Sequence, residues 1–191
     1  MSRVRALPLT MRWDLPPWAH DFVRPDQRFP TVSERMAVAV ELSRLNMVEE
    51  TGDPFGAAVF DLSTLRPLAV GVNVVAPSAT VAAHGEVVAL CLAGVGVGSH
   101  DLGVAVEGPV ELVTSCAPCM MCQGAIVGSG ISSLVIAARE NDTHSLGLGG
   151  SRRPPEWVER LRQQGIEVTE NVMRAEAVEV LREYADRGGR T

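Results

Sequence analysis

Apolar positions along this chain follow two different periods, which predicts helices alternating with strands. The first helix is expected over residues 32–49, because Thr31 and Glu34 have the spacing of a capping box and apolar residues then recur on one face. Runs rich in β-branched residues predict strands over 55–61, 68–75, 110–114, 134–138 and 166–168. Further helices are expected to begin near His84 and Cys119 and to cover 156–164 and 174–186. This alternation predicts an α/β layered domain with a mixed central sheet.

Three expectations concern the breaks in this pattern. Pro67 is expected in a loop between the first two strands, because proline has no N–H to donate to a sheet. The glycine series 94–98 is expected to end the helix that begins near His84; it lacks the G-K-[ST] sequence of a phosphate-binding loop. The polar, glycine-rich stretch 139–155 is expected to form one long loop.

The first 30 residues differ from the rest in composition. They hold five prolines together with Trp13 and Trp18, which predicts an extended arm over residues 1–30 lying on a single domain of residues 31–191. The start of the chain carries arginines and lacks the apolar stretch of a signal peptide. No run is expected to reach the ~18 apolar residues of a membrane span, so we expect a soluble, cytoplasmic protein with no membrane partner.

The charge balance bears on possible partners. The net charge is −6 and the isoelectric point is about 5.2, so the chain gains little from counterion release on nucleic acid. Arg152-Arg153 is the densest basic pair, and we interpret it as part of a solvated loop. No nucleic-acid partner is therefore expected.

Two short motifs carry the chemistry: His84-Gly85-Glu86 and Pro118-Cys119-Met120-Met121-Cys122. One imidazole and two thiolates suit zinc, and three protein ligands leave the fourth tetrahedral position to water. The two cysteines are three residues apart at the start of a predicted helix, where they share a face and the helix N-terminus favours the thiolate. Glu86 lies two residues beyond the imidazole and is available to carry protons beside the metal.

Other interpretations of the cysteines compete with this one. The C-x-x-C pair alone is compatible with a redox site, but His84 and Glu86 would then be coincidences. A purely structural zinc site, with Cys116 as the fourth ligand, or an inactive interaction module is the stronger alternative. Apart from that role, Cys91 and Cys116 are expected to be small buried apolar residues.

Residues 32–186 resemble the cytidine deaminase-like superfamily, in the branch of guanine deaminases and tRNA adenosine deaminases. The stretch Thr114-Ser115-Cys116-Ala117-Pro118-Cys119-Met120-Met121-Cys122-Gln123-Gly124-Ala125-Ile126 is similar to the T-S-C-E-P-C-P-M-C-x-G-A-I of guanine deaminases. Pro54-Phe55-Gly56-Ala57 resembles the start of the family's first strand. The resemblance implies a three-layer α/β/α sandwich that is usually a homodimer or larger.

The same resemblance implies roles for individual residues. His84, Cys119 and Cys122 would hold Zn²⁺, and Glu86 would be the proton shuttle. Asn73 matches a strand-end asparagine that contacts substrate in relatives, and Gly85, in place of the usual alanine, contributes its backbone to the pocket. Asp142 falls where guanine deaminases carry an acidic residue that accepts a ring N–H; the alternative is a loop-capping aspartate.

Two departures from the family pattern reshape the rim of the pocket: Ala117 replaces a frequent glutamate and Met120 a frequent proline. The candidates for stacking on a substrate ring are Phe55, Trp157 and the two tryptophans of the arm, each with packing as its alternative, and segment 139–155 with the last helix is a candidate lid. The expected function is zinc-dependent hydrolytic deamination of a small aminated heterocycle, foremost a purine base such as guanine. The alternatives are a nucleoside or specialised-metabolite deaminase and a zinc-stabilised module without turnover.

Overall fold

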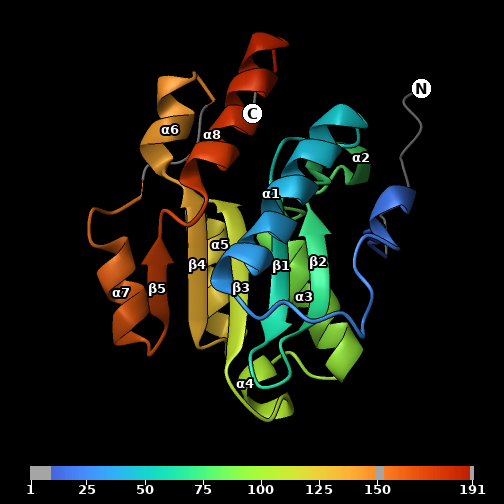
Figure 1. The fold of residues 1–191 in the computed structure, drawn as a ribbon, viewed down its shortest axis with the longest axis vertical. Coiled ribbons are helices and arrows are strands. Elements are labelled where there is room, and N and C mark those ends of the chain that lie inside the picture. The colour runs from blue at the N-terminus through green and yellow to red at the C-terminus, as the bar shows by residue number, and fades with distance from the viewer. Residues whose placement is uncertain (1–9, 149–152, 190–191) are drawn as a thin grey trace, which may run out of the picture.

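The computed structural model describes residues 10–148 and 153–189, and its centre is one mixed sheet of five strands (Figure 1). The strands are β1 (Gly56–Asp61), β2 (Arg66–Val72), β3 (Val110–Cys116), β4 (Ser133–Ala138) and β5 (Glu167–Glu170), in the spatial order β2-β1-β3-β4-β5. β1 pairs antiparallel with both of its neighbours, whereas β3, β4 and β5 pair in parallel. The predicted α/β fold with a mixed sheet is confirmed.

Helices cover both faces of this sheet, which gives three layers. α1 (Val32–Val48) and α8 (Arg174–Asp186) lie in front of it in Figure 1, and α3 (Gly85–Val97) and α5 (Met120–Gly128) lie behind. β1 divides its side chains accordingly, because neighbouring residues of a strand point to opposite faces. Ala58 and Phe60 join the core under α1, while Ala57 and Val59 join the core under α3 and α5. The three-layer α/β/α sandwich is therefore present.

The shorter elements are η1 (Pro17–Ala19), α2 (Val75–Ser78), α4 (Leu102–Ala105), α6 (Glu140–Ser145) and α7 (Trp157–Gln163). α1 begins with the expected capping box, in which the Thr31 side chain accepts from the Glu34 N–H and Glu34 accepts from the Thr31 N–H. α2 and α4 were not expected from the sequence, because one turn is too short to show a helical period.

The loops expected at Pro67 and over 139–155 are wrong, whereas the glycine series 94–98 does end its helix, at the last glycine. Pro67 lies inside β2, which tolerates it because β2 is an edge strand that, among the described residues, pairs with β1 alone. Gly94 and Gly96 lie within α3, which ends only at Gly98, where φ is 73°. The stretch 139–155 contains α6, so it is not one continuous loop.

The segment Gly85–Ala105 bears on the expectation that no stretch of the chain is long and apolar enough to span a membrane. This segment of 21 residues contains an 18-residue window with a mean hydropathy of 1.6, which is long and apolar enough to cross a membrane by length and composition alone. In the structure it comprises α3 and α4, and Ala89, Ala93 and Leu102 are fully buried in the core on the sheet. α3 ends at Gly98, so the segment is not one continuous helix; its buried residues pack within the domain, whereas Val95 and Val104 are exposed.

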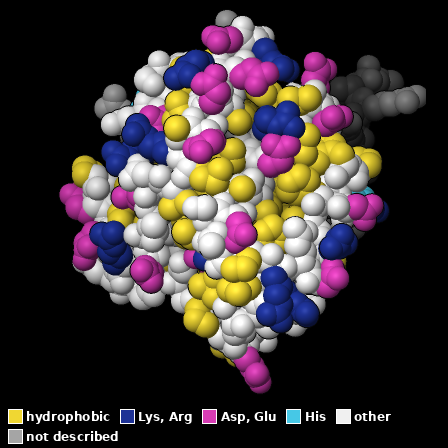
Figure 2. Space-filling model, viewed as in Figure 1, with side chains coloured by type: hydrophobic (Ala, Val, Ile, Leu, Met, Phe, Trp, Pro, Cys, Tyr) yellow, Lys and Arg dark blue, Asp and Glu magenta, His cyan; other side chains and the backbone are white. Residues whose placement is uncertain are grey.

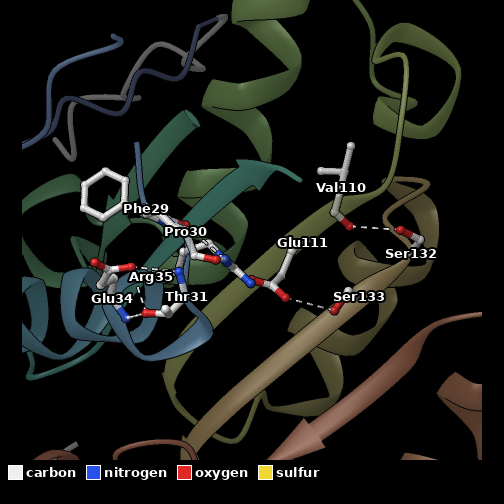
Figure 3. Close-up of polar contacts among 9 residues, drawn as sticks. All are labelled: Phe29, Pro30, Thr31, Glu34, Arg35, Val110, Glu111, Ser132 and Ser133. Carbon is white, nitrogen blue, oxygen red and sulfur yellow. Dashed lines mark hydrogen bonds and ion pairs between the residues drawn. The ribbon is translucent and has the colours of Figure 1, made fainter. Parts of the chain in front are cut away.

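A buried ion pair inside the domain, between Arg35 and Glu111, also binds the end of the N-terminal segment (Figure 3). The Arg35 Nε lies 2.5 Å from a Glu111 carboxylate oxygen, and the Arg35 Nη1 donates to the carbonyls of Phe29 and Pro30 at 3.0 and 3.2 Å. The Ser133 hydroxyl donates to the other Glu111 oxygen. These contacts join α1, β3, β4 and the end of the N-terminal segment.

Residues 10–30 pack against the α1 side of the core. η1 is their one helix, and Trp13, Trp18 and Phe22 are partly buried against the core cluster. Residues 1–9 lie outside the described part, so the division into an arm of 1–30 and a domain of 31–191 stays a prediction.

Glu111→Gln should lower the free energy of unfolding by about 3 kcal/mol, because it leaves the buried Arg35 guanidinium facing a neutral amide. Glu41→Gln is the matched control: it removes a carboxylate from an exposed pair with Arg44 and should cost less than about 1 kcal/mol. Urea unfolding followed by circular dichroism measures both. If both variants lost the same free energy of unfolding, the buried ion pair would stabilise the fold no more than the exposed one.

Candidate active site

Two helix N-termini meet at one end of the sheet and present the residues of the two motifs. His84 is the N-cap of α3 and Cys119 is the N-cap of α5, which follows directly on β3. α3 approaches the sheet closely because position 71 in β2 is a glycine. A Cβ at Gly71 would lie 2.3 Å from the Gly85 carbonyl oxygen and 2.5 Å from the Ala89 nitrogen. Any side chain there would push away the turn that carries His84 and Glu86.

The imidazole and the two thiols have the spacing of a tetrahedral metal site. The ligand atoms of His84, Cys119 and Cys122 all lie within 4.8 Å of one another. The two sulfurs are 3.5 Å apart, and His84 Nδ1 lies 3.6 and 3.5 Å from them. Tetrahedral zinc with ordinary bond lengths would separate the sulfurs by about 3.8 Å and nitrogen from sulfur by about 3.5 Å. The donor set and its spacing therefore fit zinc.

The protonation of these groups also suits a metal. The hydrogen bonds of Cys119 with Cys122 and with His84 lower the pKa of Cys119 to about 3. The hydrogen bond with Cys119 raises the pKa of His84, and the hydrogen bond between the two cysteines raises the pKa of Cys122. Cys119 is thus a thiolate at neutral pH. Zinc displaces the shared protons when it binds, since its ligands must be deprotonated.

Glu86 lies in the first turn of α3, with only 6% of its surface exposed. Burial raises the pKa of its carboxyl above the ordinary value. A carboxyl whose pKa is moved towards neutrality can both accept and donate a proton within one turnover. This is the property required of a proton shuttle.

A cavity of about 330 Å³ opens beside these residues, within the range of small-ligand sites. It is lined by Asp53, Phe55, Asn73, Val75, His84, Glu86, Thr114, Cys116, Ala117, Cys119, Thr143 and Arg153. The structure therefore brings Asn73 and Phe55 together with the predicted metal ligands and Glu86. Trp157 lies instead at a separate groove between α5 and α7. Trp13 and Trp18 pack against the core.

Asp142 faces an arginine and is not among the residues that line the cavity. The Nε and Nη2 of Arg174 donate to its two carboxylate oxygens at 2.9 and 2.6 Å, and the backbone N–H of Arg139 donates to it at the start of α6. The Arg174 side chain holds the pKa of Asp142 below its usual value. This geometry is that of the capping alternative, and the role of Asp142 in substrate binding stays a prediction. Gly85, between His84 and Glu86, is also not among the lining residues.

The other two cysteines differ from each other. Cys116 is buried as expected, and burial raises the pKa of its thiol to about 12. Among the described residues, the group with the spacing of metal ligands consists of His84, Cys119 and Cys122, and Cys116 does not belong to it. This arrangement argues against the purely structural zinc site. Cys91 was expected to be buried but is exposed, on the side of α3 that faces away from the sheet.

Several residues around the site were missed from the sequence. The side-chain amide of Asn46, fully buried in α1, donates to the carbonyls of Asp53 and Asn73 and so holds both walls of the cavity. Thr143 comes from the unexpected helix α6. Arg153 was interpreted as solvated, yet its side chain is only 7% exposed; Arg152 lies outside the described residues. Only Asp53, next to the motif Pro54-Phe55-Gly56-Ala57, had a sequence signal.

Comparison with known proteins agrees with this geometry. The family model of the cytidine and deoxycytidylate deaminase zinc-binding region matches residues 30–138. A guanine deaminase from Nitrosomonas europaea is 36% identical over 95% of this chain and 100% of that chain, with a TM-score of 0.88. NE0047 in complex with 2,6-diaminopurine is 38% identical over 94% of this chain and 95% of that one, with a TM-score of 0.89. A guanine deaminase from Bacillus subtilis, 24% identical over 70% of this chain and 92% of its own, shares the fold with a TM-score of 0.57. A search of curated proteins finds no match.

The fold and the site together define a zinc-dependent hydrolytic deaminase. The chain belongs to the family of the cytidine and deoxycytidylate deaminase zinc-binding region, which covers more than half of its length. Both the superfamily and the zinc cofactor expected from the sequence are confirmed.

Cys122→Ser should weaken zinc binding by at least about 100-fold, because it removes one of the ligand thiolates. Substituting a residue that only orients a metal ligand already costs about 10–100-fold in metal affinity. Cys91→Ser, on the exposed side of α3, should keep the parent affinity, and so should Cys116→Ser. Competition with a chromogenic chelator measures all three. A Cys116→Ser variant that loses zinc as readily as Cys122→Ser would restore the structural-site alternative.

Proposed function

We propose that the protein converts guanine and water into xanthine and ammonia. The two most similar structures described above are named as a guanine deaminase and as a complex with 2,6-diaminopurine, and both match this chain over nearly its whole length. The observation that carries the proposal is the buried carboxyl of Glu86, which lines the same cavity as His84 and Cys119, two of the three residues with the spacing of zinc ligands. A structural zinc site needs no such group.

Each residue then has a definite task. His84, Cys119 and Cys122 would hold a zinc ion, which supplies an activated water nucleophile at neutral pH. Glu86 would accept one proton from the attacking water and pass it to a ring nitrogen, then take the second proton from the hydroxyl added to the ring carbon and give it to the amine, which leaves as ammonia. Because the carboxyl is buried, these transfers take place away from bulk solvent.

The cavity walls suit a flat, polar ring. Phe55 offers the aromatic face next to the site, and Asn73, 4% exposed, offers a carboxamide whose oxygen already accepts from the Val75 N–H at 3.2 Å. This bond fixes the orientation of the amide, which favours a role in substrate recognition. We assign Gly85 a backbone contribution and keep Asp142 as a candidate that would first have to leave Arg174.

A small molecule is favoured over RNA as substrate. Figure 2 shows acidic and basic side chains interspersed over the α1 and α8 face, with neither sign gathered into one continuous patch. The net charge of −6 adds to this argument. A structure from a study of tRNA:A34 deaminases is 23% identical over 78% of this chain, which supports a shared fold only. Nucleosides and other amino-heterocycles remain the alternative substrates. A cytoplasmic location is consistent with zinc-binding thiolates, which require reducing conditions.

We also propose a homodimer, formed through the apolar groove between α3 and α5. Val87, Leu90, Val95 and Ala125 line this groove, and Val95 is 80% exposed. Light scattering should give twice the chain mass of 20.4 kDa. Val95→Glu should give the mass of a monomer. The control Val104→Glu changes an equally exposed valine on α4 and should stay a dimer. A monomeric parent protein would contradict the proposal.

Glu86→Gln should lower kcat for guanine by about 10²–10⁴-fold while the protein keeps its zinc, because the carboxyl moves protons and is not a ligand. Glu176→Gln, on the first turn of α8, should match the parent. Ultraviolet absorbance of a panel of amino-purines and amino-pyrimidines, with zinc content measured in parallel, tests both points. Full activity in Glu86→Gln would refute the mechanism, and a preference for another panel member would refute guanine alone.

A further inference from the structure

The backbone of Ala117 and Pro118, which links β3 to Cys119, makes few of the hydrogen bonds that a helix or a sheet would provide. The Ala117 N–H donates to the Ala138 carbonyl at 2.9 Å, and Pro118 has no N–H. The carbonyls of these two residues fall between a strand and a helix, where neither ladder supplies a donor. Buried carbonyls without a partner are costly, so the fold must provide donors from elsewhere.

Arg153 provides them. Its Nη2 donates to the Ala117 carbonyl and its Nε to the Pro118 carbonyl, which also accepts from the Gln123 side-chain amide at 3.1 Å. The planar guanidinium presents these two N–H groups side by side in a fixed fork. With 7% of its side chain exposed and a place in the lining of the cavity, Arg153 is a buried cation next to the zinc site.

The same guanidinium is tied to α6. Its Nη1 lies 3.2 Å from one Glu140 carboxylate oxygen, and the Arg153 backbone N–H donates to the other at 3.4 Å. His144 is the further neighbour of this carboxylate, with its Nε2 at 3.9 Å. Arg153 therefore connects the peptide before Cys119 with the helix that supplies Thr143 to the cavity.

We propose that Arg153 is a positioning residue of the zinc centre: its fork on the Ala117 and Pro118 carbonyls fixes the peptide that aims Cys119 at the metal. The fork also fixes the wall of the cavity formed by Ala117. A ligand held in this way needs no reordering when the ion binds and is slow to swing away. Groups that orient metal ligands typically contribute 10–100-fold to metal affinity.

This role differs from that of an ordinary buried ion pair with Glu140. Lysine keeps the positive charge but is a point donor, and it lacks the planar fork. If the fork on the carbonyls matters, lysine cannot replace arginine. If only the charge opposite Glu140 matters, lysine suffices, and removing the Glu140 charge does as much harm as removing Arg153.

The test measures the rate of zinc release from the zinc-loaded protein to an excess of the chelator 4-(2-pyridylazo)resorcinol. Arg153→Lys and Arg153→Gln should both release zinc about 10–100-fold faster than the parent. Glu140→Gln should give a smaller increase than either. The control Arg139→Gln removes an exposed guanidinium bonded to Asn171 and should leave the rate unchanged. Circular dichroism and urea unfolding in excess zinc confirm that each variant is folded.

Three results would overturn the proposal: parent-like zinc release from Arg153→Lys, an increase for Glu140→Gln as large as for Arg153→Lys, or an equal increase for Arg139→Gln. The readout is metal release and needs no substrate. Its failure is therefore distinguishable from a failure of guanine as the substrate.

Discussion

The meeting of two helix N-termini at one end of the sheet is the constraint on which the rest of the site depends. α3 and α5 belong to different parts of the chain, yet their caps bring the ligand atoms of His84, Cys119 and Cys122 within 4.8 Å of one another. Packing sets this distance: Gly71 lets α3 press against β2, and β3 delivers Cys119 directly to the start of α5. A small shift of either helix would separate the three side chains and remove their tetrahedral spacing.

Burial determines the protonation behaviour of the Glu86 carboxyl beside the proposed metal site. Glu86 follows His84 by two residues, so the same helical turn that presents the imidazole also places the carboxyl proposed as proton shuttle at the cavity. In water this carboxyl would be ionised at neutral pH and would rarely hold a proton. Desolvation raises its pKa, and one group can then serve both as base and as acid. The position of Glu86 in the fold therefore determines which proton transfers it can carry out.

Local sequence signals predicted the frame and the chemistry well. The capping box of α1, the β-branched runs of the strands and the H-x-E and P-C-x-x-C motifs are features of neighbouring residues, and the structure places them as expected. What the sequence could not show depends on tertiary packing. Pro67 fits a strand only because that strand is at the sheet edge. The burial of Arg153 and the amide of Asn46 follow from contacts with residues far away in the chain. Whether Asp142 faces substrate or Arg174 is likewise decided by α8, 32 residues later.

X-ray absorption at the zinc edge of the purified protein tests the central claim most directly, because it counts the ligands of the metal by element. Two sulfur atoms are expected at about 2.3 Å and two lighter atoms, the His84 nitrogen and a solvent oxygen, at about 2.0–2.1 Å. A third sulfur would place Cys116 on the metal and close the position that catalysis requires, which would rule out an open catalytic site.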